Sequence, residues 1–483
     1  MINYFIKFIL VVLIIITPIA FGSIELWAFS IMELAILLVL VLWSIQSLIN
    51  RTSRPAFFPL SSAGSKVPLF HQFEICNLKF AMPVALLSLF LLLILFQLLP
   101  LPSGLLKILS PKTYALRQSL SILDLEPSAL SFPLSFLPFA TQIEFFKWLT
   151  LIGLFFFLLY WKHSNRDLIR LMAIIMLVGA AESFYGMFEF FSGHKYILHL
   201  NMEAKIASVT GTFINRNYFA GYLLMVIPLT VGFLFSREAV QIGRFRGWRE
   251  RLVSLDGKTL IIGFCVIVMI LGLLFSASRM GISSLLLSFT LLSLLFRSPS
   301  KEQKFARTSI LILGLAILWA AWIGLDFVIS RFLTSSEDFK GRWVFWANTF
   351  QIFKDFPIFG SGLGTFTWVF PMYRSFHIVG IATHAENDFL QLASEVGFVG
   401  IGLLLILFLI FFYKAVSGIR LLSRRDPARY IGIGGLVGIL ALMFHSIVER
   451  NIQVPSNSFL YVILWAIVLR ISLRGVNKRN EPK

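Results

Sequence analysis

Long runs of apolar residues, separated by shorter polar segments, recur along the whole chain. About twelve of these runs hold roughly 17 to 23 residues, the length that a helix needs to cross a hydrocarbon core of about 30 Å. No soluble domain interrupts the series. We therefore predict transmembrane helices at residues 4–23, 27–49, 80–100, 146–162, 169–191, 217–236, 259–276, 281–297, 308–328, 396–413, 430–449 and 456–473.

Composition agrees with this pattern. Of the 483 residues, 58% are hydrophobic and only 14% are charged, and the mean hydropathy is +0.84. These values predict an all-α integral membrane protein. The first run lacks a small-residue cleavage site and leads at once into a second, so we expect a retained helix. Cys76 falls in a connecting loop and Cys265 in a span, which indicates neither a disulfide framework nor a thiolate metal site.

The net charge of +18 could suggest a nucleic-acid partner, but the basic residues alternate from loop to loop. About two-thirds of the Lys and Arg fall on one side of the predicted topology, as expected for cytoplasmic loops. We therefore expect both termini in the cytoplasm and no nucleic-acid binding. The same topology sends four polar segments to the opposite face, at residues 192–217, 276–281, 329–395 and 449–456. These segments hold nearly every cluster of side chains that could bind a ligand or take part in catalysis.

Two of the polar segments place an arginine beside a helix start. Arg216 and Asn217 follow a glycine turn at residue 211, and Asn217 can cap the helix. A capped helix with a turn before it explains this segment, but an arginine and amides at a helix N-terminus also suit an anion. Arg279 lies in the short turn at 276–281, where it either reaches lipid headgroups or binds a substrate phosphate.

The longest polar segment contains Arg342, followed by aromatic residues at helical spacing, which an interfacial amphipathic helix would explain. The glycine run from Gly360 to Gly364 could cradle a phosphate, although it follows no strand and matches no nucleotide-binding pattern.

Residues 383–391 form a polar cluster at the end of this segment. Thr383 and Glu386 have the spacing of a capping box with Thr383 as the N-cap. That device does not need His384, whereas a histidine two residues from a carboxylate offers a general base beside its modulator. Further on, His445 and Glu449 have the i, i+4 spacing of one helix face. They are open to two interpretations, a structural hydrogen bond between helices or catalysis.

Together these motifs resemble the O-antigen ligase and polymerase family of bacterial inner-membrane glycosyltransferases. The resemblance covers about residues 205–457, which we take as the core. It lies between helices one to five (1–204, with a cytoplasmic loop at 50–79 and a periplasmic loop at 101–145) and a last helix with a basic cytoplasmic tail (458–483). The core includes a long periplasmic loop at 329–395. The matching residues are Gly211 to Gly221, Ser278-Arg279 with Gly281, Arg342 with Trp346, Pro357 to Phe366, Asn387 to Gly400, and His445 to Pro455.

The resemblance implies a GT-C-like bundle in the bacterial inner membrane that works at the periplasmic face. The donor would be a glycan on undecaprenyl diphosphate, and the acceptor a hydroxyl of lipid A-core, of a lipid-linked glycan or of a protein. Neither a metal nor another cofactor is implied, and the chain has no Asp-x-Asp motif. The family's diphosphate-binding arginines correspond to Arg279 and Arg342, and we add Arg216 from its position at a helix start.

One position departs from the family pattern, because Glu386 stands where the ligase signature has a histidine and His384 comes two residues earlier. We therefore expect Glu386 as the base, assisted by His384 and positioned by Asn387, with Asn217, His445 and Glu449 in support. A multi-helix transporter or flippase of lipid-linked sugars is the alternative, and a sensor or scaffold a further one. Transporters tend to place charged groups at the bilayer midplane and to show internal repeats. Here the polar groups gather at one face and no repeat is visible.

Overall fold

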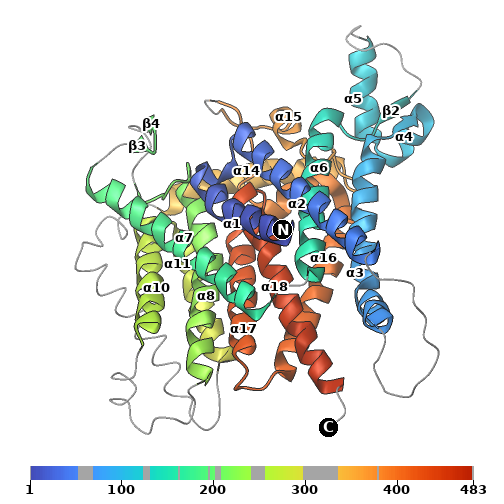
Figure 1. Cartoon of the computed structure of the whole chain (residues 1–483). Coiled ribbons are helices and arrows are strands. Elements are labelled where there is room, and N and C mark those ends of the chain that lie inside the picture. Colours follow the sequence, from blue (N-terminus) through green and yellow to red (C-terminus); the bar gives the residue numbers. More distant parts are fainter. Residues whose placement is uncertain are drawn as a thin grey trace, which may run out of the picture.

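The computed structural model describes residues 2–52, 69–122, 131–161, 164–193, 196–201, 208–240, 256–296, 335–377 and 380–480. Figure 1 shows a bundle of long helices with short elements gathered at one end. The elements are α1 (Ile2–Ile19), η1 (Phe21–Ser23), α2 (Leu26–Thr52), α3 (Leu69–Leu98), β1 (Pro100–Pro102), α4 (Ser103–Leu109), α5 (Pro111–Ile122), β2 (Ser131–Pro133), α6 (Pro138–Tyr160), α7 (Asn165–Phe191), β3 (Tyr196–Ile197), β4 (Leu200–Asn201), α8 (Arg216–Val240), α10 (Gly257–Phe275), α11 (Arg279–Leu295), α14 (Ser335–Asp355), α15 (Phe366–Val369), η2 (Phe370–Met372), α16 (Asp388–Leu421), α17 (Pro427–His445) and α18 (Pro455–Asn480).

The prediction of an all-α membrane protein is confirmed. Within the described residues, 10 helices are long and apolar enough to cross a membrane. The span predicted at 281–297 corresponds to the shorter apolar helix α11, and the span predicted at 308–328 lies outside the described residues. Three starts lie well before the predicted ones. Helix α3 begins at Leu69 instead of 80, so the expectation that Cys76 falls in a connecting loop is wrong. Helix α6 begins at Pro138, where proline at the first helical position favours initiation, and α16 begins at Asp388 but bends at Gly397, close to the predicted start at 396.

Helices α8 and α17 pack against each other at the centre of the bundle, and the membrane span of α8 is entirely buried. Glycines explain how close the two backbones come. A Cβ on Gly434 would lie 2.4 Å from the carbonyl oxygen of Pro228, and one on Gly438 would lie 2.8 Å from that of Met225. Gly434 and Gly438 have the four-residue spacing of small residues at membrane helix interfaces. Larger side chains at these positions would force the central pair apart.

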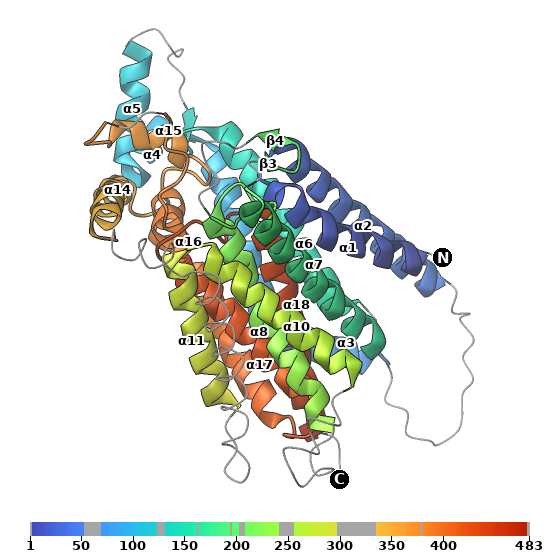
Figure 2. The ribbon, with the colours of Figure 1, turned by 90° about the vertical axis from the view of Figure 1, so that its left-hand side faces the viewer.

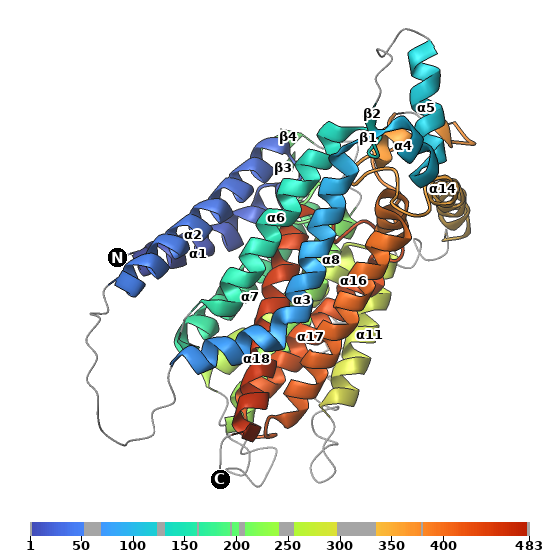
Figure 3. The same ribbon diagram turned by 90° about the vertical axis from the view of Figure 1, so that its right-hand side faces the viewer.

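Helices α1 and α2 form a pair on one flank of the bundle, beside α6 and α7, as seen from both sides in Figures 2 and 3. At the upper end in these views lie α4, α5, α14 and α15, together with the two small antiparallel sheets, β1 with β2 and β3 with β4. At this end, hydrogen bonds link four helix N-termini to one another and to the C-terminus of α17. The four N-termini are those of α8, α11, α16 and α18. Several helix ends therefore assemble the candidate site.

Candidate active site

Asp388 fixes the start of α16 against the segment between α17 and α18. Its backbone N–H donates to the carbonyl of Ser446 at 3.0 Å. Its carboxylate oxygen Oδ2 accepts hydrogen bonds from the backbone N–H groups of Asn451 and Ile452, both at 2.7 Å. The side chain is buried, where two charge-assisted hydrogen bonds count strongly. Residues 449–453 are thereby held beside the polar cluster at 383–391.

His445 is fully buried at the end of α17 and joins two other elements. Its Nε2 lies 3.4 Å from the hydroxyl of Ser278, which caps α11, and its Nδ1 lies 3.1 Å from the side-chain nitrogen of Asn451. Because the Asn451 nitrogen can only donate, Nδ1 accepts and Nε2 carries the proton toward Ser278. The prediction that His445 and Glu449 share a helix face is wrong, because α17 ends at His445 and the chain turns before Glu449.

Glu449 pairs instead with Arg342. The guanidinium of Arg342 donates through Nη1 to the carbonyl of Val448 at 2.7 Å and through Nη2 to a carboxylate oxygen of Glu449. Burial raises the pKa of Glu449 above its ordinary value, while Arg342 lowers it and the nearby Glu386 raises it further. A side-chain hydrogen bond from Asn217 also reaches Glu449. The structure thus brings together four residues that the sequence singled out: Arg342, Glu449, Glu386 and Asn217.

The backbone of Glu386 has a φ of 51°, in the left-handed region that residues other than glycine rarely adopt. Its side chain is half-buried and lies close enough to Glu449 and Tyr218 to interact with both electrostatically. The expected capping box is wrong. Because the chain turns at Glu386, the N-cap of α16 is Asn387, whose side chain accepts from Leu390 N–H at 2.9 Å, while Thr383 is exposed.

A similar correction applies to α8. Its helix begins at Arg216, and the side chain of Asn215 accepts from the N–H of Asn217 at 2.8 Å. Asn215 therefore makes the capping contact that was expected of Asn217. Since the amide of Asn217 is not used as a cap, it can bond Glu449 instead.

A cavity of about 420 Å³ opens beside this cluster, between α6, α16 and α18. Its polar end is formed by residues that lie far apart in the sequence: Glu144, Lys147, His384, Asp388, Gln391, Glu395, Arg450 and Gln453. The remaining wall is apolar and aromatic, and includes Leu87, Trp148, Phe155, Leu404, Phe408, Phe411, Met443 and Trp465. A pocket with apolar walls and a few convergent polar groups is the usual form of a small-molecule site.

His384 stands at the polar end and is half-buried. Burial, together with the positive charges of Arg450 and Lys147, lowers its pKa to about 2, although an interaction with Gln391 opposes this effect. Its Nδ1 is buried and has no hydrogen-bond partner among the described residues. The imidazole is therefore neutral at physiological pH, the form that accepts a proton.

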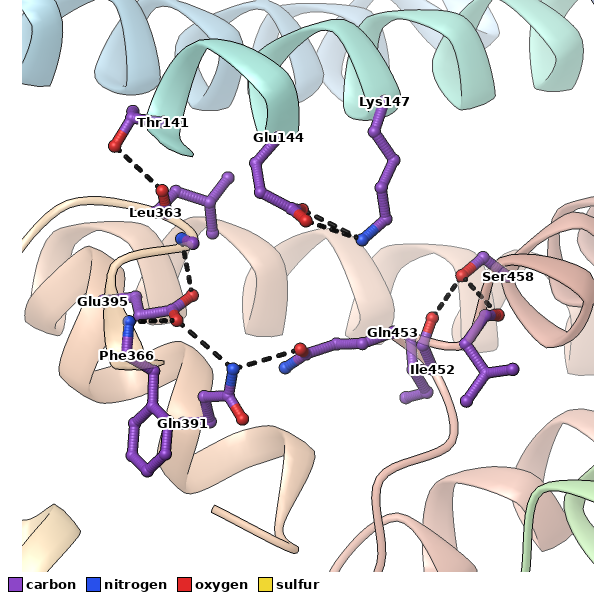
Figure 4. A network of polar contacts seen from close by, with 12 residues as sticks. Thr141, Glu144, Lys147, Leu363, Phe366, Gln391, Glu395, Ile452, Gln453 and Ser458 are labelled. Carbon is purple, nitrogen blue, oxygen red and sulfur yellow. Dashed lines mark hydrogen bonds and ion pairs between the residues drawn. The ribbon is translucent and has the colours of Figure 1, made fainter. Parts of the chain in front are cut away.

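Polar contacts hold the walls of this end in place, as Figure 4 shows. Lys147 donates to both carboxylate oxygens of Glu144, at 2.9 and 3.0 Å. Gln391 donates to Glu395 at 3.2 Å and to Gln453 at 3.1 Å. Its carbonyl oxygen accepts from the backbone N–H of Ala385 at 3.0 Å. Gln391 therefore fixes the backbone next to His384.

The glycine run does not offer a phosphate cradle. The N–H groups of Gly364 and Phe366 donate to the carboxylate of Glu395, at 3.0 and 3.1 Å, and that of Leu363 donates to Gln97 at 3.1 Å. A Cβ on Gly360, whose φ is +75°, would lie 2.1 Å from the backbone carbon of Glu395. Glycine here lets the loop wrap closely around the bend of α16.

Arg450 lines the cavity, and it was not among the expected site residues. Its guanidinium carbon lies 5.8 Å from the ring centroid of Tyr218. Across the described part of the chain no carboxylate lies within ion-pair distance of Arg450, and its buried Nε has no hydrogen-bond partner. The contrast with Arg342, which is paired with Glu449, makes Arg450 the better placed cation for an anionic ligand.

Arg279 and Arg216 occupy the first positions of α11 and α8 and are both half-buried. Neither belongs to the residues that line the cavity. Lys147 was also missed, because the sequence interpretation started the span at 146 and treated Glu144 as part of a loop. A Lys and Glu pair three residues apart at the start of a span was the signal that could have found it.

Comparison with known proteins gives one family. Residues 264–405 match the model of a family described as O-antigen ligase. No curated protein matches the chain. The matched stretch contains Arg279, Arg342, His384 and Glu386, while Lys147 and Arg450 lie outside it. The match confirms the resemblance seen in the sequence and supports the O-antigen ligase and polymerase family through residues 264–405.

Proposed function

We propose that this protein is a membrane glycosyltransferase that moves a glycan from an undecaprenyl-diphosphate donor to an acceptor hydroxyl at the periplasmic face, as a ligase or a polymerase. The O-antigen ligase domain supports a membrane glycan ligase or polymerase in general. The observation that carries the finer proposal is the cavity, because it joins an apolar wall to an end that holds two cations, a neutral histidine and three carboxylates. The protein itself engages those carboxylates, since Glu144 pairs with Lys147 while Asp388 and Glu395 accept from backbone N–H groups.

The cavity has a matching surface for each of the two parts of the donor, the isoprenoid chain and the diphosphate. The aromatic and aliphatic wall between α6, α16 and α18 suits an isoprenoid chain, whose burial is favourable in proportion to its apolar area. The polar end offers Arg450 and Lys147 to the diphosphate. Arg450 has no carboxylate partner among the described residues, and Lys147 has one, Glu144. Cations fixed in a poorly hydrated site stabilise the charge that develops on a leaving diphosphate.

His384 is the base that the geometry favours. It would take the proton of the acceptor hydroxyl while the hydroxyl oxygen attacks the anomeric carbon. The bond from that carbon to the diphosphate oxygen breaks, and the electron pair leaves with the diphosphate. The atoms and charges of this single step balance without a covalent glycosyl-enzyme intermediate and without an additional reactant.

Donor binding would also strengthen the base. The pKa of His384 is lowered by burial and by two cations, Arg450 and Lys147. A diphosphate placed between those cations offsets their charge and so raises the pKa of His384 above its donor-free value, while burial, the largest cause of the lowering, remains.

Glu386 is the second candidate for the base. It lies beside Glu449 and Tyr218, outside the cavity lining. Arg342, Glu449, Asn217 and His445 are proposed to position this end of the bundle, and Asn387 to start the helix that carries the cluster. Arg279 and Arg216 are proposed to meet the glycan or the diphosphate from the neighbouring helix starts.

Purified protein in proteoliposomes, supplied with an undecaprenyl-diphosphate glycan and an acceptor, tests the function. Glycan transfer is expected, and His384→Ala is expected to remove it while Glu386→Gln retains most of it. The reverse order of effects would make Glu386 the base. Movement of the donor across the bilayer without any transfer would instead favour a flippase and overturn the proposal.

A further inference from the structure

A second cavity lies at the opposite end of the bundle from the proposed active site. Helix α18 shows the separation, because Ser458 near its start lines the first cavity and Arg474 near its end lines the second. The second cavity is a crevice of about 860 Å³ between α1, α7 and α18. Its wall is largely apolar, and includes Phe8, Leu10, Val11, Leu158, Leu168, Leu171, Ile174, Ile463 and Ile467.

The charged residues of the crevice gather at its outer end. On α1, Lys7 lies nearer the helix terminus than Val11, and on α7, Arg170 lies nearer the terminus than Ile174. On α18, Arg470 and Arg474 follow Ile463 and Ile467 toward the C-terminus. All three helices therefore change from apolar to basic in the same direction. This end is the one that the distribution of basic residues assigns to the cytoplasm.

The described residues do not balance the charge at this end with carboxylates. Lys7 pairs with Asp167 at 2.9 Å, and Arg474 with Asp426 at 3.5 Å. Arg170 reaches Asp167 only at 4.0 Å. Among the described residues, the four cations of the crevice thus share two carboxylates, Asp167 in its lining and Asp426 outside it.

Arg470 makes no ion pair among the described residues. The Nη1 of its guanidinium donates to the carbonyl of Trp161 at 2.6 Å and lies 3.4 Å from those of Leu158 and Leu159. These carbonyls end α6, so the guanidinium is fixed at the mouth of the crevice. Neutral carbonyl partners leave its charge uncompensated.

We propose that this crevice binds an anionic phospholipid of the surrounding membrane leaflet. The lipid phosphate would lie among Arg170, Arg470 and Arg474, and an acyl chain would follow the apolar wall toward Val11 and Ile463. Basic pockets between transmembrane helices attract acidic headgroups, and each nearby cation adds to the attraction. A second copy of this chain fits less well, because its own basic face would be repelled. This lipid site is independent of the proposed transferase activity.

Native mass spectrometry of the detergent-purified protein tests the proposal, with phosphatidylglycerol and phosphatidylcholine as the two probes. Wild-type protein should retain phosphatidylglycerol preferentially. The double variant Arg170→Gln/Arg474→Gln should bind phosphatidylglycerol about 25-fold more weakly, at roughly fivefold for each cation removed. Leu171→Trp keeps every charge but fills the apolar wall, and should weaken phosphatidylglycerol retention as well.

The matched control is Arg424→Gln/Arg425→Gln, which removes the same charge from exposed residues outside the crevice. It should retain phosphatidylglycerol like the wild type. If the double variant does not fold, Arg170→Gln alone replaces it, because that side chain is 76% exposed. Equal retention of both lipids by the wild type, or unchanged retention in the crevice variants, would overturn the proposal. So would a dimer whose crosslinks map to the crevice.

Discussion

Arg450→Gln removes the cation that the proposed mechanism places on the donor diphosphate. Hydrogen bonds to charged groups contribute about 1.5–3 kcal/mol, so the donor should bind about 10- to 150-fold more weakly. The fold should tolerate the change, because Arg450 contacts Tyr218, through its ring and a side-chain hydrogen bond, and interacts with Asp388 through charge alone, without a bonded carboxylate. Donor affinity is measured by titrating an undecaprenyl-diphosphate glycan into the purified variant, and kcat/KM by transfer in proteoliposomes.

Arg425→Gln supplies the matched control, since it removes one positive charge from an exposed residue in the loop between α16 and α17. It should bind the donor and turn over like the wild type. If Arg450→Gln kept both its melting temperature and its wild-type donor affinity, the placement of the diphosphate beside Arg450 would be wrong.

Three further predictions concern the framework of the site. Burial raises the pKa of Glu449 above its ordinary value of 4.5, so the folded protein holds a proton that the unfolded chain releases. This group therefore makes stability fall as the pH rises from 4.5 toward neutrality. Glu449→Gln should reduce that slope in melting temperatures recorded from pH 4.5 to 8, and an unchanged slope would refute the assignment. Gly360→Ala should prevent folded expression, because the added Cβ would lie 2.1 Å from the backbone carbon of Glu395. Gly341→Ala has open space around it and should gain up to about 1 kcal/mol of stability. Size-exclusion profiles separate the two variants, and a well-folded Gly360→Ala would contradict the packing. Asp388→Ala should lower the melting temperature by removing about 3 kcal/mol of hydrogen bonding to residues 451 and 452, and an unchanged melting temperature would show that this clamp contributes little.

The length of the apolar runs was sufficient to predict the ten described helices that can cross a membrane, because the bilayer sets their length and composition. Their ends were less predictable. Thr383 had the spacing of an N-cap, but the left-handed turn at Glu386 moved that role to Asn387. His445 and Glu449 had the spacing of one helix face, but α17 ends between them. Spacing alone does not reveal where a backbone turns.

The candidate site was predictable only in part. The cluster at 383–391 and Arg342 stood out because polar residues are rare in this chain, and the structure places both at one end of the bundle. Lys147 was missed because it reaches the cluster from α6, more than 200 residues earlier in the sequence, and Arg450 because it meets the cluster from the segment between α17 and α18, about 60 residues later. The choice between His384 and Glu386 likewise depends on which side chain faces the cavity, and local sequence does not contain that information.

The most direct test of the proposed function measures glycan transfer by the purified protein with a defined undecaprenyl-diphosphate glycan, in the wild type and in His384→Ala. The mechanism predicts a glycan joined to the acceptor hydroxyl in the wild type, and no such product from His384→Ala although that variant still binds the donor. Undiminished transfer by His384→Ala would contradict the role of the histidine, and the absence of transfer in the wild type would contradict the glycosyltransferase itself.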